Sequence, residues 1–195
     1  MAGKESSLWK MCLVLTVISI AAAAGLAAVY EVTKKPIEES QNRKRAEAIN
    51  KVLPGFSGTT ETVRVMPLTG KDSVTLNMAY ADGQLFGAAV ETYTDKGFGG
   101  AFTLMVGFDS EGKILGTEVL SASETPGLGD KINADKSDFS KQFAGKNPAE
   151  FQLKVKKDGG DVDAITAATI SSRAYCDAVD RAYQSFMKAK EESHE

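Results

Sequence analysis

The stretch FTLMVGFDSEGKILGTEVL, residues 102–120, decides the fold of this 195-residue chain. It holds two apolar runs, 102–108 and 114–120, with a polar turn at 109–112 between them. Two short apolar runs around such a turn predict a pair of antiparallel strands joined as a hairpin. The rest of the predicted sheet extends outward from this hairpin.

Further strands are predicted on both sides of it. Residues 62–66 and 74–80 alternate in polarity, and Asp82-Gly83 marks a turn before a third run at 85–94. On the C-terminal side, residues 151–155 are expected to form a strand before a turn at 158–160. Together these runs predict an antiparallel, curled sheet or meander.

Helices are predicted at the two ends of the strand region. Residues 36–53 predict a helix with Pro36 in its first turn, and residues 137–144 a short helix with Ser137 as its N-cap. A longer helix is expected at about residues 170–190. Its apolar positions recur with helical spacing on one face: Tyr175, Val179, Ala182 and Phe186. Strands with helices at the ends indicate an α+β domain.

A membrane helix is predicted at residues 11–30, MCLVLTVISIAAAAGLAAVY, which carry no charge. Twenty helical residues span about 30 Å, the thickness of a bilayer core. Trp9 and Tyr30 flank the run, as aromatic residues do at membrane interfaces. Two alternatives are a cleaved signal peptide, with the alanines at 21–24 as cleavage site, and a buried core helix. The length of the run favours a retained anchor, and lysines on both sides leave its orientation open.

The chain is therefore expected to contain five parts. These are a cytoplasmic tail at 1–10, the transmembrane helix at 11–30, a helical connector at 31–60, a ligand-binding domain at 61–190 and a frayed C-terminus at 191–195.

Composition excludes several functional classes. The net charge is −3, and no basic stripe is present, which argues against nucleic acid as a partner. The cysteines, Cys12 and Cys176, lie far apart without metal-ligand spacing, so no disulfide is predicted. The single histidine, His194, is next to last. A metal site or a Ser-His-Asp triad therefore lacks its residues.

Three polar or glycine-rich segments are candidates for a binding site. Two are loops, Gly97-Phe98-Gly99-Gly100 and Glu124-Thr125-Pro126-Gly127-Leu128-Gly129, which the predicted strands bring to one region of the sheet. The third, Asp163-Ala-Ile-Thr166-Ala-Ala168-Thr169, opens the last helix. A helix N-terminus offers free N–H groups and a positive dipole end, which favour a phosphate. Taken alone, the same segments are also compatible with turns and a helix cap.

The combination of these segments with one N-terminal membrane helix resembles the G subunit of the Rnf ion-translocating electron-transport complex. The C subunit of the sodium-pumping NADH:quinone reductase is a relative of that family. The attachment signature of the family, Asp-x-x-(Ser/Thr)-Gly-Ala-Thr-x-(Ser/Thr), is matched by Asp163, Thr166, Ala168, Thr169 and Ser171. Ala167 departs from it, because it replaces the usual glycine.

This resemblance implies an FMN joined covalently through its phosphate to Thr169 by a separate flavin transferase. It assigns Asp163 to transferase recognition and Thr166 to capping and phosphate contact. Ala168 and the two loops are expected near the cofactor: Gly97, Phe98, Gly99, Gly100, Glu124, Thr125, Gly127, Leu128 and Gly129.

The resemblance also implies other membrane subunits of the complex as partners, and electron flow between ferredoxin and NAD coupled to ion movement. The expected location is the bacterial inner membrane, with the FMN domain on the extracytoplasmic side. Three alternatives remain at this point: the equivalent component of the quinone reductase, a membrane-anchored binding module without flavin, and a stand-alone flavin reductase.

Overall fold

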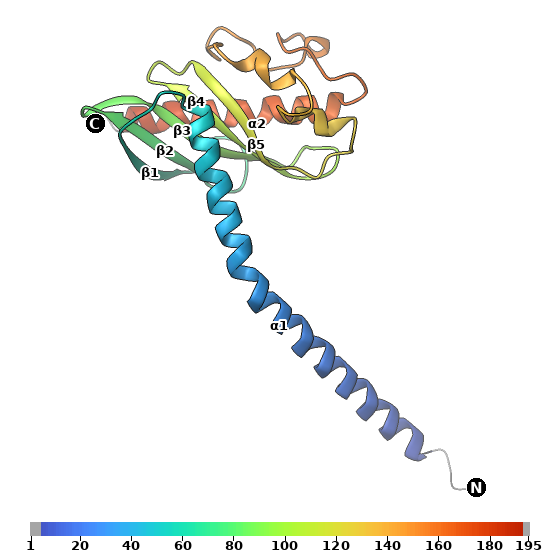
Figure 1. Ribbon diagram of the computed structural model, residues 1–195. Coiled ribbons are helices and arrows are strands. Elements are labelled where there is room, and N and C mark those ends of the chain that lie inside the picture. Colours follow the sequence, from blue (N-terminus) through green and yellow to red (C-terminus); the bar gives the residue numbers. More distant parts are fainter. Residues whose placement is uncertain (1–4, 193–195) are drawn as a thin grey trace. The chain divides into compact units, whose positions relative to one another are not determined.

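The structure is a computed structural model that describes residues 5–192, with side chains from Leu8 onward (Figure 1). The chain divides into two compact units after Arg43, and each is described by itself. Residues 1–4 of the predicted tail and 193–195 of the predicted frayed terminus lie outside the described residues.

The first helix, α1 (Glu5–Val52), runs without a break through Pro36, so the prediction of a second helix starting at Pro36 was wrong. A proline removes one backbone donor, and the surrounding residues are mostly good helix formers, which explains why the helix continues. Its N-terminal part is long and apolar enough to cross a membrane. No side chain of that apolar window is buried, so the alternative of a buried core helix was also wrong.

The second unit is built on a five-stranded antiparallel sheet in the order β1-β2-β3-β4-β5. The strands are β1 (Thr59–Val65), β2 (Val74–Ala81), β3 (Gln84–Thr94), β4 (Phe102–Asp109) and β5 (Ile114–Ser121). Each strand pairs with the next in sequence. The predicted meander and the α+β class are therefore confirmed, including the hairpin at residues 102–120.

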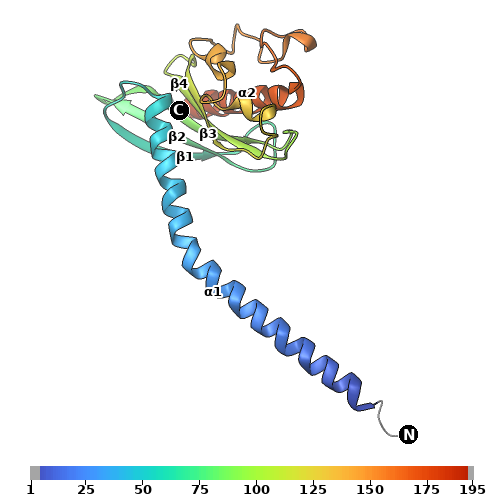
Figure 2. The ribbon, with the colours of Figure 1, turned by 45° about the vertical axis from the view of Figure 1, so that its right-hand side comes forward.

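The last helix, α2 (Thr169–Glu192), packs on one face of the sheet (Figures 1 and 2). The apolar face predicted for it is confirmed, because all four of its residues are fully buried: Tyr175, Val179, Ala182 and Phe186. They pack against alternate strand residues such as Val90 and Val106. This packing decides where the first turn of α2 lies.

The opposite face of the sheet is covered by the last residues of α1, which belong to the second unit. Val52 and Leu53 pack there with Ala89 and Met105. Gly107 has no room for a side chain, because a Cβ would collide with the carbonyl oxygen of Val52. The central strands of the sheet are therefore covered on both faces.

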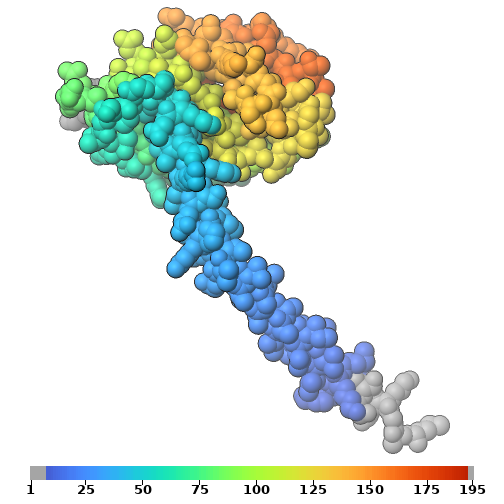
Figure 3. Space-filling view, in the orientation of Figure 1, coloured from blue at the N-terminus to red at the C-terminus, as the bar shows by residue number. Residues whose placement is uncertain are grey.

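Between β5 and α2 the chain forms an irregular segment with three 3₁₀ helices: η1 (Gly129–Ile132), η2 (Phe139–Phe143) and η3 (Lys156–Asp158). In the space-filling view, this yellow-to-orange segment covers one end of the domain (Figure 3). The short helix predicted at 137–144 is the 3₁₀ helix η2, and its N-cap is Asp138, so the prediction of Ser137 as the N-cap was wrong. The hydroxyl of Ser137 accepts the N–H of Phe139, two residues later in the chain. This hydrogen bond closes a short turn before η2.

The prediction of a strand at residues 151–155 was wrong. This stretch forms only one isolated bridge, between Val155 and Val162. Its apolar residues are held by side-chain packing: the rings of Phe143 and Phe151 lie 6.5 Å apart, and Phe143 lies 5.1 Å from Tyr175 of α2. A short apolar run does not distinguish a strand from a loop whose side chains fill the core.

A buried guanidinium joins α2 to the sheet and to the β1–β2 loop. Arg181 donates to the carbonyl of Thr69 at 2.7 Å, to Asp177 at 2.9 Å and to the carbonyl of Tyr93. It also lies 4.8 Å from the centre of the Tyr93 ring, and the Tyr93 hydroxyl accepts the N–H of Asp72 at 2.7 Å. One side chain therefore connects three elements.

We expect Arg181→Leu to lower the free energy of unfolding by about 3 kcal/mol, because it leaves the carbonyls of Thr69 and Tyr93 and part of Asp177 without their donor. Urea unfolding of the detergent-solubilised chain, followed by circular dichroism, measures this loss. Arg173→Leu is the matched control on the same helix. It breaks only an exposed pair with Asp158 and should cost much less. Equal losses in both variants would contradict the role given to Arg181.

Candidate functional site

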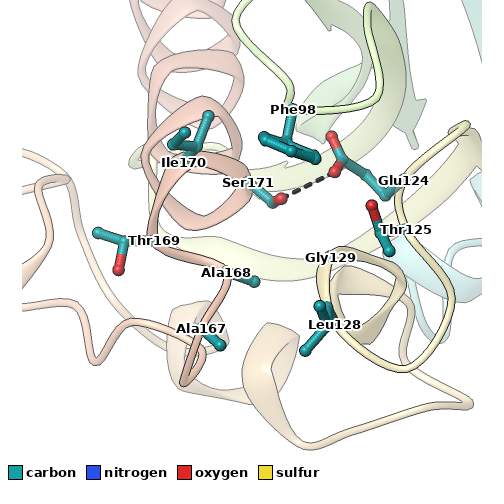
Figure 4. A pocket seen from close by; sticks show the side chains of 10 residues that line it. All are labelled: Phe98, Glu124, Thr125, Leu128, Gly129, Ala167, Ala168, Thr169, Ile170 and Ser171. Atoms are coloured by element: carbon teal, nitrogen blue, oxygen red, sulfur yellow. Dashed lines mark hydrogen bonds between the residues drawn. The ribbon is translucent and has the colours of Figure 1, made fainter.

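A cavity of about 320 Å³ lies beside the first turn of α2 (Figure 4). Three segments that are distant in sequence form its walls: the loop after β3, the segment after β5 and the start of α2. The residues lining it are Phe98, Glu124, Thr125, Leu128, Gly129, Ala167, Ala168, Thr169, Ile170 and Ser171.

The lining is mostly apolar and includes three large side chains that remain open to solvent. Phe98, Leu128 and Ile170 are 68%, 41% and 48% exposed, respectively. Each comes from a different segment. Large apolar side chains gathered around a concave site are typical of a surface that binds a flat apolar ligand or a partner.

One carboxylate is buried in this otherwise apolar wall. Glu124 is only 7% exposed, and its Oε2 accepts a hydrogen bond of 2.8 Å from the Ser171 hydroxyl. Its other oxygen, Oε1, has no hydrogen-bond partner in the structure. A buried polar atom without a partner costs free energy, and this oxygen lies against Gly97.

Two glycines make room for this carboxylate. A Cβ on Gly97 would lie 2.5 Å from Glu124 Oε1. On Gly129 it would lie 2.7 Å from the Ser171 hydroxyl oxygen and against Glu124 Oε2. Larger residues at either position would therefore displace the carboxylate. Both glycines allow the Glu124 carboxylate to lie close to their backbone. Gly97 does so although it does not line the cavity.

The start of α2 is held by hydrogen bonds of its own. The Ser172 hydroxyl makes two of them: it accepts the N–H of Ile165 at 2.9 Å and donates to the carbonyl of Ala168 at 3.0 Å. Thr169 is the first residue of the helix and is half-buried at the edge of the cavity. The first N–H groups of a helix have no partner within it, so a phosphate on Thr169 would meet free donors and the positive end of the helix dipole.

The loop after β3 is attached to α2 next to the cavity. Lys96 donates to Asp177 at 2.5 Å, and Thr94 donates to the same carboxylate at 2.9 Å. Burial raises the pKa of Asp177, but these hydrogen bonds and the charge of Arg181 outweigh burial, so its pKa is lowered. A lowered pKa means that the stabilisation is present at neutral pH and is lost as the pH falls through that value.

Two residues of the predicted motif lie outside the cavity. Asp163 is exposed, and its carboxylate pairs with Lys156 at 2.8 Å. The Gln142 side chain holds the Asp163 backbone from both sides, accepting its N–H at 2.8 Å and donating to its carbonyl at 3.2 Å. Thr166 is exposed in the turn before the helix. Both are accessible to another protein.

The structure thus brings together members of all three predicted segments. Seven predicted residues line the cavity: Phe98, Glu124, Thr125, Leu128, Gly129, Ala168 and Thr169. Six others do not: Gly97, Gly99, Gly100, Gly127, Asp163 and Thr166. The prediction missed Ala167, Ile170 and Ser171 as lining residues, although Ser171 belongs to the signature and its spacing from Thr169 was a usable signal.

These residues fit FMN. The apolar rim suits a flat ring, and Thr169 offers a hydroxyl at a helix start. Within the described part of the chain, no three His, Cys, Asp or Glu side chains are grouped as metal ligands.

Comparison with known proteins supports this fit. The family model of the FMN-binding domain matches residues 97–184, which include all three segments. The G subunit of the ion-translocating oxidoreductase complex of Vibrio atlanticus is 36% identical over 88% of this chain and 87% of its own length. The same protein of Aliivibrio fischeri is 35% identical over 94% and 92%, and that of Escherichia coli K12 is 37% identical over 83% of both chains. The chain therefore belongs to the family of G subunits of the Rnf ion-translocating oxidoreductase complex and contains an FMN-binding domain.

Proposed function

We propose that this chain is the electron-transfer subunit that carries FMN through a phosphoester at Thr169 in a membrane-bound, ion-translocating ferredoxin:NAD oxidoreductase. The observation that carries the proposal is the position of Thr169, at the start of α2 and on the edge of a cavity with an apolar rim. The other two hydroxyls of the lining suit attachment less well. Ser171 is hydrogen-bonded to Glu124, and Thr125 does not stand at a helix start.

Attachment follows from the chemistry of a hydroxyl and a pyrophosphate. The Thr169 oxygen forms a bond to the FMN phosphorus of FAD, the pyrophosphate P–O bond breaks, and AMP leaves. The hydroxyl proton passes to a base on the flavin transferase. Exposed Asp163 and Thr166 are available for recognition by that enzyme.

Once attached, FMN supplies the electron-transfer chemistry, and the protein supplies position and electrostatics. The apolar rim formed by Phe98, Leu128 and Ile170 lies at the protein surface, so it would hold the ring in an open site. A ring held this loosely would be lost by dilution without a covalent link. The link therefore permits a site that is open enough for electron exchange with a neighbouring subunit.

One candidate membrane-spanning helix, in a member of this family, indicates a single-pass membrane protein. The partners in the proposal are the other subunits of the complex and the flavin transferase. We further propose the bacterial inner membrane as the location, with the FMN domain on its extracytoplasmic side.

We expect Thr169→Ala to abolish the FMN adduct, because the variant lacks the oxygen that bonds to phosphorus. Intact mass and in-gel flavin fluorescence of the full chain, co-produced with a flavin transferase, measure this. Thr169→Ser keeps a hydroxyl and should still load, and Thr62→Ala, on the exposed face of β1, should load as the wild type does. An adduct in folded Thr169→Ala would show that Thr169 is not the acceptor. A wild-type chain without adduct would favour a binding module without covalent flavin.

Ala167 carries backbone strain at the same loop. Its φ is +61°, a left-handed conformation that costs a residue with a Cβ about 1–2 kcal/mol. This is the position where the family signature has glycine, so the structure supplies a physical reason for that glycine. The alanine methyl group also lines the cavity.

Ala167→Gly should raise the free energy of unfolding by about 0.5–1 kcal/mol, because relief of strain exceeds the entropy that glycine adds to the unfolded chain. Thermal or urea unfolding of the FMN-free full chain measures the gain. Ala168→Gly is the matched control: its φ is not positive, so glycine there should destabilise the chain. A loss of stability in both variants would contradict the strain argument.

A further inference from the structure

Gln142, in η2, holds the first residue of the acceptor loop, which we define as residues 163–169. A glutamine side chain has one acceptor oxygen and two N–H donors, and all three are used here. Its Oε1 accepts the N–H of Asp163 at 2.8 Å, and its Nε2 donates to the carbonyl of Asp163 at 3.2 Å. The same nitrogen donates to the carbonyl of Phe139 at 2.9 Å. The side chain therefore joins η2 to both backbone groups of Asp163, as a neighbouring strand would.

The other end of the acceptor loop is held by α2. The Ser172 hydroxyl bonds to the N–H of Ile165 and to the carbonyl of Ala168. With Gln142 at its first residue, the loop has side-chain partners at both ends, although most of it lies outside regular secondary structure. These contacts give the backbone of the loop one conformation before any other protein binds to it.

The carboxylate of Asp163 is held much less firmly than its backbone. Its side chain is 72% exposed and pairs with Lys156, which is itself 61% exposed. Ion pairs this exposed contribute little stability, because water screens the charges. The carboxylate can therefore exchange Lys156 for a cationic group of another protein, while Gln142 keeps the backbone in place. A fixed backbone with a replaceable side-chain partner suits a residue that another protein recognises.

We propose that Gln142 is a positioning residue for flavin attachment: it holds the Asp163 backbone and so presents the Asp163 carboxylate to the flavin transferase at a fixed distance from the Thr169 hydroxyl. The proposal rests on the proposed function of Thr169. In that reaction the Thr169 oxygen bonds to the FMN phosphorus of FAD, AMP leaves, and the hydroxyl proton passes to the transferase. A loop that is fixed beforehand loses less conformational entropy when it binds, so Gln142 strengthens binding to the transferase.

Gln142→Ala tests this role through the kinetics of attachment. The FMN adduct is measured over time in the detergent-solubilised full chain, with purified flavin transferase and excess FAD. We expect the KM for the chain to rise about tenfold, because both hydrogen bonds to Asp163 are lost. The kcat should stay the same, since Thr169 and the start of α2 are unchanged. Gln142→Glu, which loses both donors and keeps the acceptor, should also raise the KM.

Gln152→Ala is the matched control, because it removes an exposed glutamine of the same irregular segment, and its KM should equal that of the wild type. Binding of free FMN to the chain without adduct, followed by quenching of flavin fluorescence, should be unchanged in Gln142→Ala, because Gln142 does not line the cavity. A wild-type KM in both Gln142 variants would overturn the positioning role and leave Thr169 as the acceptor. Weaker binding of free FMN would show general damage to the domain and would also overturn that role.

A double-mutant cycle shows whether Gln142 acts through Asp163. Asp163→Ala should raise the KM by itself. Adding Gln142→Ala to that variant should change the KM by less than about twofold, because the carboxylate to be presented is already absent. Losses that multiply in the double variant would overturn the proposal, since Gln142 would then act independently of Asp163. A wild-type chain that never gains an adduct would instead overturn the attachment at Thr169 and, with it, this role.

Discussion

The packing of α2 against the meander is the constraint on which the rest of the domain depends. Tyr175, Val179, Ala182 and Phe186 are fully buried on the sheet, so the helix has one rotation and one position along its axis. That position places Thr169 and Ser171 beside the loops that leave β3 and β5. Arg181 strengthens the same contact by joining α2 to β3 and to the β1–β2 loop. The site is therefore a consequence of core packing and is assembled by elements that are rigid.

The site itself shows features that lower stability and have value only with a ligand. Ala167 holds a left-handed conformation, and Phe98 exposes a large apolar ring. Each feature is unfavourable in the chain alone. Natural proteins concentrate such departures at functional sites, where binding or chemistry offsets their cost. Two of them around one cavity support a cofactor site more strongly than the glycine-rich loops do by themselves.

Much of the fold was predictable because its signals are local. Alternating polarity marked the strands, and the spacing of Tyr175, Val179, Ala182 and Phe186 marked α2 and its buried face. Errors arose where local signals were shared by different structures. Pro36 suggested a helix start, yet an exposed helix tolerates the loss of one donor. Phe151 and Val155 suggested a strand, yet they fill the core from an irregular segment. The threonine motif was visible through its resemblance to a family, whereas Ile170 gave no signal as a lining residue.

By itself the sequence determined the apolar N-terminal helix, the meander and the threonine at the start of the last helix, because periodicity, turn residues and motif spacing are properties of neighbouring residues. Only the tertiary structure decided that Gly97, Glu124, Gly129 and Ser171 meet, since these residues lie up to 74 positions apart and the packing of α2 on the sheet brings them together. It also decided that Glu124 Oε1 is left without a partner and that Ala167 is left-handed. Burial and backbone strain depend on the surroundings of a residue in space, and these are set when the core forms.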